Sequence, residues 1–141
     1  MPTSARSAAA LVAALLVGLV VSAAAQAAPG DLDPTFSGDG MQTTDLGGGD
    51  LASGVVLQGD GKIVAVGQSG AGGYDFAVAR YNPNGLLDTS FSGDGKQTTD
   101  FGGEFGIDVA TAVALAPDGK IVAVGRGGPG VDFALARYLG G

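Results

Sequence analysis

The sequence predicts an all-β fold made of two copies of one unit, and three observations support this prediction. A long segment of the sequence occurs twice with few changes. The apolar residues come in short runs between Gly-rich stretches, and most of these apolar residues are Ala and Val. Short apolar runs bounded by Gly and Asp are typical of strands, and stacked units of one kind share a core. Bulky helical packing is not expected from so few aromatic residues.

The repeat covers almost all of the chain after its N-terminal segment. Residues 36–47 read FSGDGMQTTDLG and residues 91–102 read FSGDGKQTTDFG. The match continues through GDGKIVAVG and PDGKIVAVG, and through DFAVARY and DFALARY. We therefore divide residues 28–141 into two tandem units, 30–84 and 85–141.

Each unit is expected to supply four short strands. The first lies at 51–58 and 109–116, the second at 62–67 and 120–125, the third at 75–81 and 132–138, and the fourth at 96–101, with 41–46 as its N-terminal counterpart. In the third strand large and small residues alternate, so one face carries mainly Ala. Four strands joined by tight turns and repeated along the chain form the blade of a β-propeller. The prediction is two propeller-type blades of four antiparallel strands each. A β-solenoid is the alternative, but its coils are usually shorter.

Asp-Gly pairs occupy the predicted turns: Asp60-Gly61, Asp118-Gly119 and Asp94-Gly95. Asp-Gly between two apolar runs is a strong hairpin signal, because Gly accepts the positive φ that a tight turn needs. The Asp side chain ordinarily bonds the nearby backbone in such a turn. We therefore interpret these six residues as structural.

The first 27 residues differ from the rest. One charge, Arg6, precedes an uncharged apolar run over 8–21, and Ala25-Gln26-Ala27 follows as a small-residue site. This order is typical of a helical secretory signal peptide cleaved after Ala27. A permanent membrane anchor is the alternative, but the run is short for a span. We expect a secreted, extracellular or cell-surface protein with no membrane attachment after cleavage.

Composition limits the chemistry. The chain has no His and no Cys, which excludes the usual catalytic triads, thiol nucleophiles and common zinc sites. Its net charge of −7 repels nucleic acid. The carboxylates recur at matching places in both units, whereas a catalytic residue is normally singular. We therefore predict no catalytic, cofactor-binding or metal-binding residue. Calcium held loosely by clustered carboxylates is a minor alternative.

Two arginines end the third strands. If Arg80 and Arg137 point between blades, each needs a carboxylate, since a buried charge must be paired. Asp45 and Asp100 lie on the neighbouring fourth strands, and we predict that they form structural ion pairs with these arginines.

The phrases LDTSFSGDGKQTTDFG, AVALAPDGKIVAVGRG and DFALARY resemble the delta-60 repeat, a propeller-like repeat of exported bacterial proteins. The resemblance implies propeller-like architecture and export, and it brings no assigned catalytic activity. Members of that family usually string together enough repeats to close a ring, and this sequence has two.

Three functions follow from these observations. The first is an exported, non-catalytic β-propeller repeat module with a binding, surface or structural role. The second is a fragment or remnant of a longer repeat protein without separate activity. The third is a propeller-type, metal-assisted hydrolase or lyase.

The predicted partner is further propeller repeats or the chain itself. A strand at 41–46 would reach the open edge of a neighbouring copy, so head-to-tail association of three or four chains would give six or eight blades. A marginal monomer with a frayed N-terminal strand is the alternative.

Overall fold

The computed structural model describes residues 28–102 and 106–141, and the regular secondary structure of these residues is entirely β-strand. The predicted signal peptide, residues 1–27, lies outside the described residues. The strands are β1 (Leu51–Leu57), β2 (Ile63–Ser69), β3 (Asp75–Tyr81), β4 (Lys96–Thr99), β5 (Val109–Leu115), β6 (Ile121–Gly127) and β7 (Asp132–Tyr138). The bounds of β3 and β7 are those predicted, and the others differ by one or two residues. No described helix is long and apolar enough to cross a membrane.

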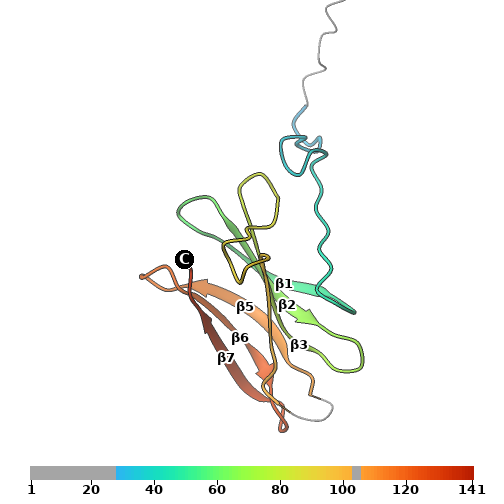
Figure 1. The fold of residues 1–141 in the computed structure, drawn as a ribbon, viewed down its shortest axis with the longest axis vertical. Coiled ribbons are helices and arrows are strands. Elements are labelled where there is room, and N and C mark those ends of the chain that lie inside the picture. Colours follow the sequence, from blue (N-terminus) through green and yellow to red (C-terminus); the bar gives the residue numbers. More distant parts are fainter. Residues whose placement is uncertain (1–27, 103–105) are drawn as a thin grey trace, which may run out of the picture.

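The strands form two antiparallel sheets (Figure 1). The first sheet, here blade one, has the order β1-β2-β3-β4, and the second, blade two, has the order β5-β6-β7. The strand β4 belongs to the second sequence unit but pairs with β3 of the first. Blade one therefore takes its outer strand from the following unit, as the predicted strand order requires.

The predicted strand at 41–46 is wrong for this chain, and blade two consequently has three strands instead of four. The segment lies against blade one, where the Tyr81 hydroxyl donates a 2.8 Å hydrogen bond to Thr44 Oγ1. A strand needs the edge of another strand to pair with. The equivalent segment forms β4 because it lies beside the edge of β3, whereas 41–46 has no such edge beside it.

The core lies between the two blades. Blade one contributes large residues, and blade two covers them with its small-residue face, as the alternation in the third strands predicts. The buried members are Val64, Val66, Phe76 and Val78 from blade one and Ala110, Ile121, Ala123 and Ala134 from blade two. The ring of Phe76 also meets Phe101 edge-on, with centroids 4.8 Å apart. Small residues let the backbone of blade two approach closely, and the large ones fill the remaining space.

The predicted Asp-Gly turns are present in the structure. Gly61 and Gly119 have φ values of 84° and 79°. In the first hairpin the Gly61 N–H donates to Gln58 O over 2.9 Å, and Asp60 Oδ1 accepts from Lys62 N over 3.2 Å. The same contacts recur around Asp118, and Asp94 accepts from Lys96 N at the turn that holds Gly95. These side chains stabilise turns.

Replacing Gly61 or Gly119 by Val is expected to lower the free energy of unfolding by roughly 1–3 kcal/mol, because a β-branched residue resists positive φ. Chemical denaturation of each variant measures the loss. Gly59→Ala is the matched control: it changes a glycine of the same turn that lies outside the positive-φ region and has open space beside it. Equal stability of the Val variants and the control would contradict the turn assignment.

Candidate functional site

The most deeply buried cationic side chain among the described residues is Arg80, near the end of β3. Its side chain is 1% exposed, and its Nε lies 2.8 Å from Asp88 Oδ2 in an ion pair. Its two terminal nitrogens donate to Ser90 Oγ and to Gly140 O, and its guanidinium stacks over the Phe91 ring. The predicted partners of Arg80 are therefore wrong: Asp88, which follows β3 in the chain, holds this charge instead of Asp45 or Asp100.

The Asp88 carboxylate forms ion pairs with two cationic side chains. Lys62 Nζ lies 3.2 Å from the same Oδ2 that pairs with Arg80, and Ser90 donates to Oδ1 through its N–H and its hydroxyl. Burial alone would raise the pKa of Asp88, but the Ser90 hydrogen bonds, Lys62 and Arg80 together lower it to about 2. Asp88 is therefore ionised at neutral pH, and the cluster of Arg80, Asp88, Lys62 and Ser90 is a structural ion network rather than an acid–base centre.

The counterpart of Arg80 in blade two is in a different environment. Arg137 is exposed and forms no ion pair with any carboxylate of the described residues, so the predicted pair with Asp100 is not formed. Asp45 and Asp100 instead accept backbone N–H groups two residues later, from Gly47 and Gly102. These two carboxylates stabilise turns that follow the fourth-strand segments.

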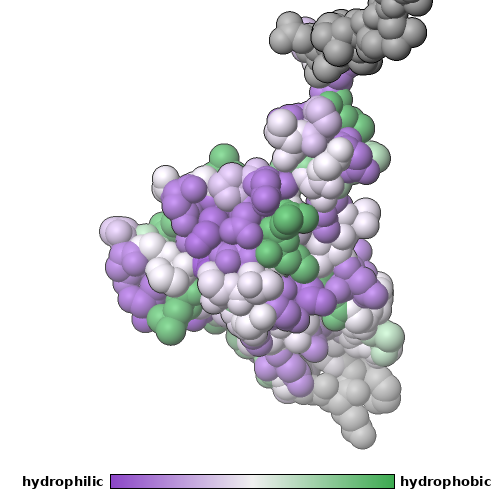
Figure 2. Space-filling view, turned by 45° about the horizontal axis from the view of Figure 1, so that its top comes forward, coloured by the Kyte–Doolittle hydropathy of each residue, from purple (hydrophilic) through white to green (hydrophobic). Residues whose placement is uncertain are grey.

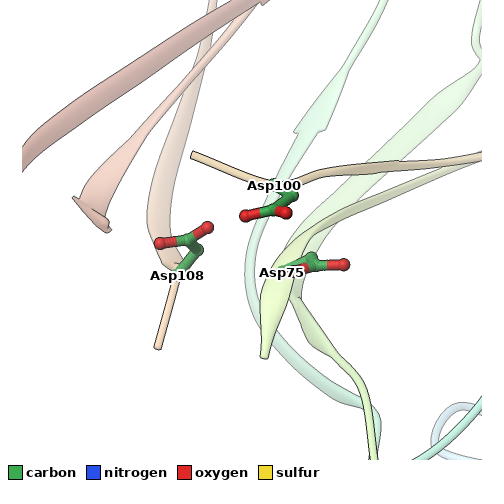
Figure 3. A group of neighbouring side chains, drawn as sticks. All are labelled: Asp75, Asp100 and Asp108. Atoms are coloured by element: carbon green, nitrogen blue, oxygen red, sulfur yellow. The ribbon is translucent and has the colours of Figure 1, made fainter. Parts of the chain in front are cut away.

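A second group of polar residues lies where the chain passes from blade one to blade two. Asp75 begins β3, Asp100 follows β4 and Asp108 precedes β5, and one carboxylate oxygen of each lies within 4.8 Å of the others. Figure 3 shows the carboxyl groups of Asp100 and Asp108 turned toward each other. We refer to these three residues as the crossover cluster.

Asp108 is fully buried and its oxygens are occupied. Its Oδ2 accepts from Phe101 N over 2.7 Å, and its Oδ1 accepts from Gly128 N over 2.8 Å. The same contact recurs in the first unit, where Asp50 accepts from Leu46 N over 2.9 Å. Because the contact repeats, Asp108 and Asp50 each anchor a fourth-strand segment to the start of the next blade.

Oxygen donors of this kind suit hard cations such as Ca²⁺, which takes six to eight oxygen ligands. The crossover cluster supplies three carboxylates, one of which already accepts two backbone hydrogen bonds. Burial raises the pKa of Asp75, and the negative charges of Asp100 and Asp108 raise it further. The ionised carboxylates of the crossover cluster therefore repel one another in the structure.

We expect Asp75→Asn to raise the melting temperature at pH 7, because it removes a carboxylate that its neighbours repel. The folded-state pKa of Asp75 is above its ordinary value of 3.8, so the ionised group costs stability above that pH and costs nothing once protonated below it. The gain should therefore disappear at pH 3. Melting curves at both pH values, with and without Ca²⁺, measure it. A lower melting temperature at pH 7, with Ca²⁺ stabilising only the original chain, would contradict the prediction.

Sequence reasoning missed two of these roles. Asp88 is one of the carboxylates that recur in both units, but its pairing with Arg80 is not predicted, because the pair spans a loop and the predicted pairs join neighbouring strands. The sequence does not predict the roles of Asp108 and Asp50, because the two units differ in length just before these residues. The available signal was an Asp directly before the first strand of each blade.

Residues 58–91 and 116–140 match the family model described as a β-propeller domain of unknown function, DUF5122. The chain is similar to a β-propeller repeat family. The first matched segment runs from the first unit into the start of the second and includes β2 and β3, and the second matched segment lies in the second unit and includes β6 and β7, in agreement with the two observed sheets. No curated protein and no solved structure gave a significant match.

Proposed function

We propose that this chain is an exported, non-catalytic β-propeller repeat module of the delta-60 type, with a binding, surface or structural role. The observation that supports it best is the recurrence of polar contacts. The turn bonds of Asp60 and Asp118, the anchors made by Asp50 and Asp108, and the hydroxyl contacts of Tyr81 and Tyr138 occur in both units. Side chains that repeat the same contacts in both units are explained by structure, which supports a non-catalytic role for them.

The surface that remains for a partner is the pair of outer blade faces. Figure 2 shows apolar patches set among hydrophilic residues on one side of the molecule. The largest exposed apolar side chains include Val55 and Leu57 on blade one and Phe133 and Leu135 on blade two. Exposed apolar residues gathered on a sheet face are characteristic of interaction surfaces.

Export is tested by the N-terminus of the secreted protein. When the complete sequence is expressed in a bacterial host, material in the periplasm or medium should begin at Ala28 or within a few residues of it, as the Arg6, apolar run and Ala25-Gln26-Ala27 order predicts. N-terminal sequencing measures this. An intact Met1 terminus in the membrane fraction would contradict the export proposal.

Catalysis is tested separately. A hydrolase and lyase screen with and without Ca²⁺ should give no turnover above background. Turnover that is lost in the Asp100→Asn variant and restored in the original chain by Ca²⁺ would favour the metal-assisted enzyme, since Asp100 is the exposed member of the crossover cluster.

A further inference from the structure

Two pairs of equivalent residues in the third strands of the two blades differ widely in exposure. Phe76 is 0% exposed while its counterpart Phe133 is 94% exposed, and Val78 is 0% exposed while its counterpart Leu135 is 62% exposed. In blade one these side chains are covered by blade two. The outer face of blade two therefore repeats, residue for residue, a face that is covered within the same chain.

The outer face of blade one repeats the covering face in the same way. The residues with which blade two packs on the core have counterparts on the outer face of blade one: Ala123 and Ala65, Ala136 and Ala79, and Tyr138 and Tyr81. Beside them Val55 and Leu57 are each 65% exposed, whereas the counterpart Leu115 packs against the core. The chain thus carries the residues of both halves of its internal interface, one on each outer face, and on blade one Ala79 is already 5% exposed in the single chain.

Charge follows the same pattern. Within the chain Arg80 pairs with Asp88, whose Oδ1 accepts the N–H and hydroxyl of Ser90. Arg137 corresponds to Arg80, and Asp33 corresponds to Asp88. Asp33 Oδ1 accepts the N–H of Thr35 over 2.9 Å and its hydroxyl over 2.7 Å, so the same turn is already formed. Arg137 and Asp33 are both exposed.

The edge strand β7 of blade two and the segment 41–46 also match a pair of strands within the chain. Within the chain β4 pairs with β3, with Gln97 opposite Val78. The counterparts are Gln42, in the segment 41–46, and Leu135, on the edge of β7 that pairs with no other described strand. The segment already lies against blade one as β4 lies against blade two, since the Thr44–Tyr81 contact of 2.8 Å matches the Thr99–Tyr138 contact of 2.9 Å.

We propose that the outer face of blade two binds the outer face of blade one of a second copy, and that residues 41–46 of that copy complete blade two as its fourth strand. The partner is thus another copy of this chain, joined head to tail through the interface that already holds the two blades together. Arg137 pairs with Asp33 of the second copy. This goes beyond the proposed function, does not depend on export, and allows roughly three or four copies to close a ring.

Charge reversal tests the pairing. Sedimentation velocity of the folded full chain should show association, and Arg137→Glu and Asp33→Arg should each weaken this association at least tenfold. The two variants mixed together should associate again, because each supplies the charge that the other now needs. Asp31→Arg is the matched control, since it makes the same charge change at a position whose counterpart Leu86 is exposed within the chain. Association that ignores Arg137→Glu, or a folded monomer at all concentrations up to about 0.5 mM, would overturn the proposal.

A disulfide tests the register. The chain has no Cys, so Gln42→Cys with Leu135→Cys places one thiol on each outer face. Opposed residues of an antiparallel pair lie about 4.5–5.5 Å apart, within disulfide range. Oxidation should give reducible oligomers on a denaturing gel, whereas Leu135→Cys alone should stop at dimers. Val78→Cys with Gln97→Cys is the control in which the link forms inside one chain. Absence of oligomers from the first pair, with the control link formed, would overturn the register.

Discussion

Replacing Asp88 by Ala is expected to lower the free energy of unfolding by about 3–5 kcal/mol, which is the usual cost of leaving a buried charge without its partner. Arg80 is 1% exposed, and its Nε lies 2.8 Å from Asp88 Oδ2 in an ion pair that lacks the alignment of a hydrogen bond. The remaining contacts of its guanidinium, with Ser90, Gly140 and the Phe91 ring, carry no negative charge. Chemical denaturation monitored by far-UV circular dichroism measures the loss.

Two controls separate charge from packing. The double variant Arg80→Met with Asp88→Ala should be more stable than Asp88→Ala alone, because no unpaired charge is then buried. Asp33→Ala changes the counterpart residue, which is exposed, and should cost less than about 0.5 kcal/mol in dilute protein. A loss below 1 kcal/mol for Asp88→Ala would show that water reaches Arg80 and that the ion network is not buried.

The pH dependence follows from the same residue. The folded-state pKa of Asp88 is about 2, below its ordinary value of 3.8, so its contribution to stability is fully present above about pH 4 and is lost as the pH falls toward 2. Asp88→Asn should flatten the stability curve in this window and leave its shape between pH 5 and 7 unchanged.

The sequence predicts the parts of this fold that are set locally. The hairpin at Gly61 depends on its own φ, and the alternation of Phe76, Ala77 and Val78 sorts large and small residues onto two faces in any sheet. For that reason the third strands and the Asp-Gly turns agree with the prediction. The anchors made by Asp108 and Asp50 are also local in pattern, but a difference in unit length separates them in the alignment.

What the sequence leaves open depends on neighbours. The segments 41–46 and Lys96–Thr99 differ in few residues, yet only the second forms a strand, because only it has the edge of β3 beside it. Likewise, the motif that buries Arg80 exposes Arg137. The same residues therefore adopt different structures in the two units, because a packing surface covers them in one unit and not in the other.

The clearest measure of that difference is Phe76→Ala against Phe133→Ala. Phe76 is fully buried between the blades and contacts Phe101 edge-on, so truncation is expected to cost about 3–5 kcal/mol. Phe133 occupies the same position of the same motif but is 94% exposed, so its truncation should change the stability of the dilute chain by less than about 0.5 kcal/mol. Urea denaturation of both variants, at a concentration where the chain is monomeric, measures the pair.

A higher protein concentration should change the stability loss of Phe133→Ala but not that of Phe76→Ala. Phe76 is covered within the chain, so the cost of its truncation should not depend on protein concentration. Phe133 is covered only when a second copy docks, so Phe133→Ala should begin to cost stability as the concentration rises and association stabilises the original chain by mass action. Equal losses at low concentration would mean that Phe133 is already buried in the isolated chain. Two concentration-independent values would mean that no second copy covers it.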